Sequence, residues 1–80
     1  MPPLSRFKRF DVRPLLQRGE EPLPEILARV QAIESGSGLI LVAPFLPAPL
    51  LELLSSRGYA SKVERGEQGS WVVYFWQEKE

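Results

Sequence analysis

The sequence predicts an α+β two-layer sandwich in which two helices cover one face of a four-stranded sheet. Segments with strand and helix patterns follow one another in the order β-α-β-α-β-β, without an internal repeat or a linker. Both strand–helix–strand connections should be right-handed, which places both helices on the same face of the sheet. The 80 residues, 44% of them hydrophobic and 25% charged, suit one globular domain over residues 1–80.

The first half of the chain supplies a strand, a loop and a helix. Residues 7–12 alternate imperfectly and predict a strand whose inward side chains are Phe10 and Val12. Residues 13–21 are expected to form a polar loop. Pro22 and Pro24 then begin a helical pattern, because proline is tolerated in a first turn. Its apolar face comprises Leu23, Ile26, Leu27, Val30 and Ile33, and the Ser-Gly-Ser-Gly run at 35–38 ends it.

The second half begins with an uninterrupted apolar run at 39–43, which is typical of an interior strand. A proline-rich loop at 44–49 leads into a leucine-rich helix that reaches residue 57, with Gly58 as its C-terminal cap. Residues 59–65 and 71–76 are expected to be the last two strands, and the glycine-containing residues 66–69 the hairpin turn between them.

Charge and composition exclude several classes of function. Ten basic and ten acidic side chains give a net charge of zero, which argues against a protein built to grip nucleic acid. Five basic residues lie near the N-terminus, and we interpret them as the charged side chains of an edge strand rather than a nucleic-acid arm: Arg6, Lys8, Arg9, Arg13 and Arg18.

The sequence contains no cysteine and no histidine, so neither a metal site nor a hydrolase triad is expected, and no cofactor is predicted. The glycines form no phosphate-binding loop motif. The N-terminus lacks the apolar core of a signal peptide, and the longest apolar run is far shorter than the ~20 residues of a membrane helix. We therefore expect a cytoplasmic protein without membrane contact.

The element order, the Asp11-Val-Arg13 strand end and the Glu21-Pro-Leu-Pro24 helix start resemble the TusA/SirA-like family, over nearly the whole chain. The similarity is greatest to an uncharacterised, cysteine-less bacterial branch of TusA-related domains. The resemblance implies a mixed sheet of strand order 1-2-4-3. In that family a cysteine before the Pro-x-Pro motif carries a persulfide, and Glu21 stands at its position here. Sulfur transfer is thereby excluded, since no other cysteine can replace it.

Several polar and apolar residues around the start of the first helix are candidates for binding a ligand or partner: Asp11, Arg13, Glu21, Pro22, Pro24 and Phe45. Asp11 and Arg13 share a face at a strand end and could form a polar pocket with Glu21. The structural interpretation is that Asp11 accepts loop amides, Arg13 forms a surface ion pair, and Glu21 caps the helix. We favour this structural interpretation.

The last strand offers a second candidate surface. We assign Trp71, Val73 and Phe75 to the core because relatives tend to place arginine or threonine at the alternate positions. Val72, Tyr74 and Trp76 would then form an aromatic patch on the open face of the sheet, available for a protein partner or for a homodimer. The competing interpretation is that the C-terminal tail or basic side-chain stems cover these rings.

Three functions remain open from the sequence. The first is a non-catalytic TusA-like binding or accessory module that acts through protein–protein interaction. The alternative is a small-ligand-binding or weakly catalytic domain with a polar pocket at the first helix. The third is single-stranded RNA binding through the open sheet face, since the fold also resembles the C-terminal domain of translation initiation factor 3; the zero net charge makes it the least favoured.

Overall fold

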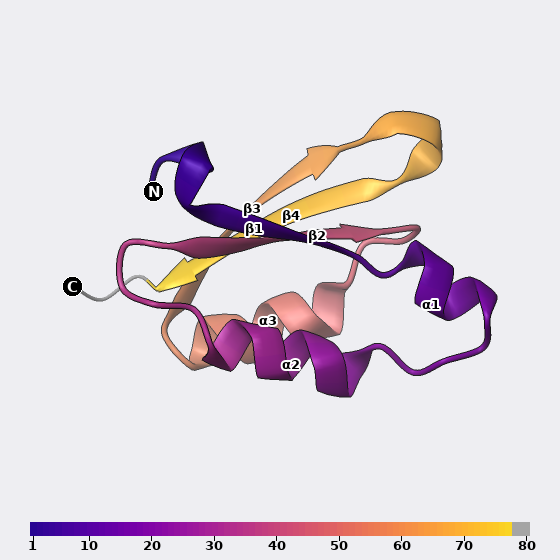
Figure 1. The fold of residues 1–80 in the computed structure, drawn as a ribbon, viewed down its shortest axis with the longest axis horizontal. Coiled ribbons are helices and arrows are strands. Elements are labelled where there is room, and N and C mark those ends of the chain that lie inside the picture. The colour runs from indigo at the N-terminus through magenta and orange to yellow at the C-terminus, as the bar shows by residue number, and fades with distance from the viewer. Residues whose placement is uncertain (78–80) are drawn as a thin grey trace.

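The computed structural model describes residues 1–77 as a four-stranded mixed sheet with helices on one face (Figure 1). The strands are β1 (Phe7–Asp11), β2 (Gly38–Ala43), β3 (Tyr59–Arg65) and β4 (Trp71–Gln77). The helices are α1 (Arg13–Gln17), α2 (Leu23–Gln31) and α3 (Ala48–Ser56), with short 3₁₀ turns η1 (Leu4–Arg6) and η2 (Glu67–Gly69). The α+β architecture is as the sequence predicts, and the strand order β1-β2-β4-β3 is the one that the family resemblance implies.

The sheet combines one parallel pair with two antiparallel pairs. β1 runs parallel to β2, with Phe7 opposite Gly38, because α1 and α2 carry the chain back between them. β4 is antiparallel to both of its neighbours and lies in the interior of the sheet, between β2 and β3. The β-branched and aromatic residues at 71–76 have a high β propensity, which suits this central position.

The hydrophobic core lies between the sheet and the helices α2 and α3. Phe10 and Val12 are buried at the end of β1, as expected, and Val73 and Phe75 of β4 are completely buried. The amphipathic face of α2 contributes Ile26 and Val30. The remaining members of the core cluster come from β2 and α3: Leu39, Leu41, Ala43, Leu50 and Leu54.

The predicted loop over residues 13–21 is wrong in its first part, because residues 13–17 form the short helix α1. The backbone amide of Leu16 donates to the carbonyl of Val12, and Pro14 stands in the first turn, where a missing amide costs nothing. Leu15 and Leu16 pack against the core. Their apolar side chains, rather than helix propensity, hold this single turn at the end of β1.

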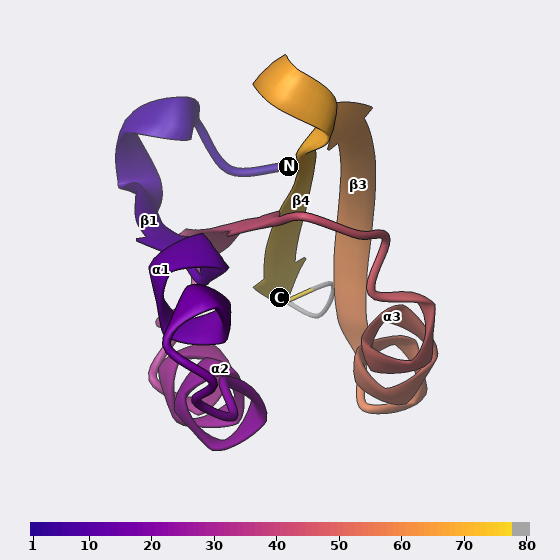
Figure 2. The same cartoon turned by 90° about the vertical axis from the view of Figure 1, so that its right-hand side faces the viewer.

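The other face of the sheet carries no helix within residues 1–77, but it is partly covered. Figures 1 and 2 show the N-terminal segment on the side away from α2 and α3, and the β3–β4 hairpin rises on the same side. Val42, which points to this face, is only 3% exposed. Trp71, expected in the core, is half-buried instead, and the Arg65 guanidinium lies 4.6 Å from its ring centroid.

Both long helices begin at the same end of the molecule, which Figure 2 shows facing the viewer. Each starts next to a pair of prolines, Pro22 and Pro24 for α2 and Pro47 and Pro49 for α3. α3 ends near the predicted cap, where Gly58 adopts a φ of 90° that favours glycine. No helix within residues 1–77 has the length and apolar character needed to cross a bilayer.

Candidate functional site

An apolar groove of about 270 Å³ lies between the first turns of α2 and α3. Both helix starts and the β2–α3 loop contribute to it. We call this feature the α2–α3 groove; the residues that line it are Glu21, Pro22, Leu23, Ile26, Phe45, Pro47, Pro49, Leu50 and Leu53. Three of the six residues proposed around the first helix are among them. The other six residues that line the groove were not predicted as binding residues, because the sequence pattern indicates core or loop positions for them.

The groove combines a buried floor with an exposed apolar rim. Pro22, Ile26 and Leu50 are buried, whereas Leu23 is 42% and Phe45 52% exposed. A small domain normally turns such side chains inward, and single exposed ones need no explanation. Here they flank one concavity, which is the usual form of a binding site.

The backbone around the groove follows from its prolines. Pro44 directly follows β2 and has no amide to extend the strand ladder, so Phe45 lies in the β2–α3 loop and is exposed. Leu23 is the first residue of α2 and lies beyond the core-facing stripe of that helix. The helical periodicity predicted that Leu23 belongs to the core-facing side of α2. The structure shows it exposed instead, and this exposure identifies it as part of the groove rim.

Glu21 lines the groove just before α2. Its Oε1 accepts a hydrogen bond of 3.4 Å from the backbone amide of Leu23, and the side chain is exposed. The interaction resembles a capping bond, because it occupies one of the free amides of the first turn. Pro24 stands in the same turn but is exposed and outside the groove lining.

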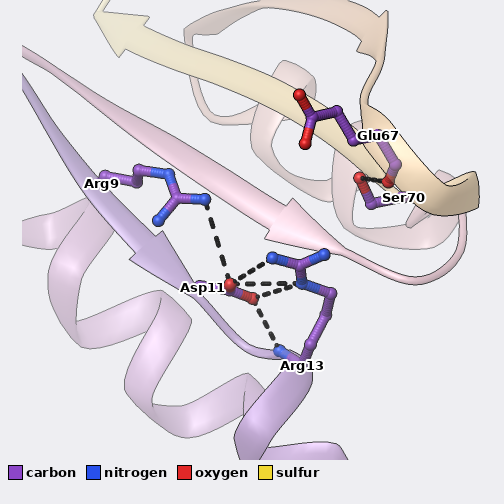
Figure 3. A network of polar contacts seen from close by, with 5 residues as sticks. All are labelled: Arg9, Asp11, Arg13, Glu67 and Ser70. Carbon is purple, nitrogen blue, oxygen red and sulfur yellow. Dashed lines mark hydrogen bonds and ion pairs between the residues drawn. The ribbon is translucent and has the colours of Figure 1, made fainter.

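Asp11 and Arg13 form a compact ion pair at the end of β1 (Figure 3). The Nη2 of Arg13 donates to Oδ2 of Asp11 at 2.6 Å, and its Nε donates to Oδ1 at 2.9 Å. The backbone amide of Arg13 donates to the same carboxylate at 3.0 Å. Arg9 approaches it to 4.0 Å. The partners of the carboxylate are thus near neighbours in the chain, chiefly Arg13 at the start of α1.

This pairing determines the chemistry of Asp11. The hydrogen bond from the Arg13 side chain lowers the pKa of Asp11, more than burial raises it. An acid with a lowered pKa stays ionised near neutral pH and makes a poor proton acceptor. The geometry therefore suits an anchor for the start of α1 better than an acid–base catalyst.

The structure separates this pair from Glu21, so the three side chains do not line one pocket. Asp11 and Arg13 border a shallow hollow with Pro14, Gln17 and Gln68, whereas Glu21 faces the α2–α3 groove. Within residues 1–77 no hydrogen bond or ion pair joins Glu21 to Asp11 or Arg13. Residues 13–17, which connect the two in the chain, form α1 rather than the predicted loop.

The open-face candidates Val72, Tyr74 and Trp76 lie opposite Val42, Ile40 and Gly38 of β2 and are half-buried. The Phe7 ring packs edge-on against both aromatic rings, with centroids 5.6 Å from Tyr74 and 6.4 Å from Trp76. Tyr74 also donates a hydrogen bond of 3.2 Å to Glu64. Phe7 and Glu64 therefore cover part of the expected aromatic patch. Residues 78–80 of the C-terminal tail, the other cover expected from the sequence, lie outside the described residues.

Metal ligands do not gather anywhere in residues 1–77, since no group of three suitable side chains is present there. No curated protein and no solved structure matches the chain. Residues 9–77, which span the whole sheet except the first two residues of β1, match the family described as "Uncharacterized conserved protein (DUF2249)". The chain therefore belongs to this family.

Proposed function

We propose that the chain is a non-catalytic binding module that holds an apolar segment of a partner protein in the α2–α3 groove. The observation that supports this most is the exposed apolar rim of the groove, formed by Leu23 and Phe45 above the buried Pro22, Ile26 and Leu50. Large apolar side chains that fill such a pocket are the usual anchors of a protein interface.

The charge of the groove indicates which side chains the partner segment should contain. Among the described residues that line the groove, Glu21 is the one ionisable side chain, and it is exposed at the groove edge. A partner segment with a lysine or arginine next to its apolar anchors would complement this carboxylate. An anionic ligand is disfavoured there, even though two helices begin at the groove, because it would approach a like charge.

A TusA-like origin, in which the scaffold persists without its chemistry, is consistent with this role. Relatives in that family use the residue before Pro-x-Pro for sulfur transfer, and the chain has Glu21 there and no cysteine elsewhere. A carboxylate cannot form a persulfide. In this proposal, the surface that once presented a reactive sulfur to partner proteins remains a docking surface.

A peptide selection tests the proposal with a defined probe. A phage-displayed library of 12-residue peptides is selected on the wild-type domain and counter-selected on Phe45→Ser. We expect enriched peptides to share two large apolar residues and a neighbouring basic residue. Leu23→Ser and Phe45→Ser should each weaken their binding by about tenfold, since each removes ~1–2 kcal/mol of apolar contact.

Val63→Ser provides the matched control, because Val63 is a similarly exposed apolar residue (40%) on β3, away from the groove. Its peptide affinity should equal that of the wild type. Failure to enrich any common sequence, or equal binding of the selected peptides to wild type and Leu23→Ser, would rule out the groove as the docking site.

A further inference from the structure

We infer that a second site, at the opposite end of α2 from the groove, binds the phosphate group of a small phosphorylated molecule. The site is a hollow of about 280 Å³ that we call the basic hollow; its charged and polar walls are Arg6, Lys8, Arg29, Glu34 and Ser37. Arg6 and Lys8 come from η1 and β1, which are adjacent in the chain, and Arg29 comes from the last turn of α2, which is distant from them in sequence.

Two of the three cations are oriented before any ligand arrives. The Arg6 guanidinium donates to the Ser37 hydroxyl through Nη2 at 3.1 Å and Nε at 3.4 Å. Arg29 lies over the Phe10 ring, 4.0 Å from its centroid, and contacts Glu25 at 3.2 Å. Planar guanidinium groups fixed in this way match phosphate oxygens well and lose little entropy on binding.

The hollow also has an excess of positive charge. Neither Arg6 nor Lys8 forms an ion pair with a carboxylate within residues 1–77, and Glu34 is the only acidic side chain in that part of the lining. The chain as a whole has no net charge, so this local excess reflects placement rather than composition. Within residues 1–77 the lining thus contains three cations and one carboxylate, and such a local excess attracts an anion, a dianion more than a monoanion.

Size and lining indicate the class of ligand. The volume accommodates a phosphate and a small organic group, and Ala32, Ile33 and Leu39 provide apolar surface for the latter. Of the described residues that line the hollow, none has an aromatic ring on which a base could stack. A compact phosphate monoester therefore fits the hollow better than a nucleic-acid strand does.

Amide NMR titration of the whole chain tests this inference. Inorganic phosphate and glycerol phosphate are added at constant ionic strength, with chloride as the reference anion. We expect saturable shifts centred on the amides of Lys8, Ser37 and Gly38, with half-saturation below about 10 mM. Lys8→Gln should weaken binding at least about fivefold, because it removes one of the cations that line the hollow. It should leave the fold intact, because the Lys8 side chain makes no hydrogen bond or ion pair within residues 1–77.

Arg57→Gln is the charge-matched control, since it removes one exposed cation at the end of α3, outside the hollow. Equal weakening in both variants would overturn the inference, because it would show only a general charge effect. An absence of saturable shifts, or shifts centred elsewhere, would overturn it too. The inference would also fail if an eight-nucleotide oligothymidylate bound at these amides more tightly than glycerol phosphate. That result would indicate a site for the sugar-phosphate backbone of a nucleic acid.

Discussion

At the scale of single residues, the Asp11 carboxylate fixes the passage from β1 into α1. It accepts the backbone amide of Arg13 and side-chain hydrogen bonds from Nε and Nη2 of the same residue. Arg13 is thereby drawn back over the strand end, which positions the first turn of α1. The sequence made this structural role the favoured interpretation of Asp11, because a short acidic side chain after a strand commonly binds the amide two residues on.

Asp11→Asn should lower the free energy of unfolding by about 1 kcal/mol at pH 7, because the charge-assisted bonds to Arg13 are weakened. The pKa of Asp11 in the folded state is below its ordinary value of 3.8, so its ionised form favours folding. This contribution is complete above that value and disappears as the pH falls through the lower, folded-state pKa. Urea unfolding of both proteins from pH 7 to about pH 2.5 measures it; a difference that persists undiminished at the lowest pH would contradict this role of the carboxylate.

Gly38 is required by close approach of its neighbours rather than by its backbone angles. A Cβ atom there would overlap the Phe7 ring and lie 2.7 Å from the carbonyl oxygen of Phe75. We expect Gly38→Ala to lower the free energy of unfolding by about 1–3 kcal/mol, as overpacking does. Thermal unfolding measures this. Gly36→Ala, at an open position where only the positive φ opposes a side chain, should cost less.

At the scale of elements, the sequence predicts those with a long periodic pattern and misses the shortest α-helix. The apolar stripe of α2 and the uninterrupted run of β2 each span enough residues for a pattern to be read. α1 has five residues, too few to show a helical pattern. Its Leu15 and Leu16 are stabilised by packing against the core, which the local sequence does not reveal.

The β3–β4 turn contains a local strain that can be relieved. Gln68 adopts φ 57° and ψ 37°, a left-handed conformation that costs a side-chain-bearing residue ~1–2 kcal/mol. Gln68→Gly should raise the free energy of unfolding by about 0.5 kcal/mol, the relief exceeding the added freedom of the unfolded chain. Denaturant unfolding measures the free energy of unfolding of Gln68→Gly and of Gln68→Ala. Only the glycine variant should gain stability, because alanine retains the backbone strain. An equal gain in both variants would point to a cause other than backbone conformation.

At the scale of the whole molecule, the topology was predictable, whereas the shapes of the two candidate binding surfaces were not. Right-handed connections and the family resemblance lead to the observed sheet order before any coordinate is known. The α2–α3 groove, in contrast, depends on how far two helix starts and a proline-rich loop lie from one another. The zero net charge likewise conceals the basic hollow, because an average says nothing about where charges meet.

The proposed docking surface is the α2–α3 groove rather than the open face of the sheet. Amide NMR titration of the wild-type domain with a selected peptide distinguishes the two surfaces within one spectrum. We expect the shifts to concentrate in residues 21–26 and 45–53, which contain the groove lining. Shifts that concentrate instead on β4, at Val72, Tyr74 and Trp76, would show that the partner binds the sheet and not the groove.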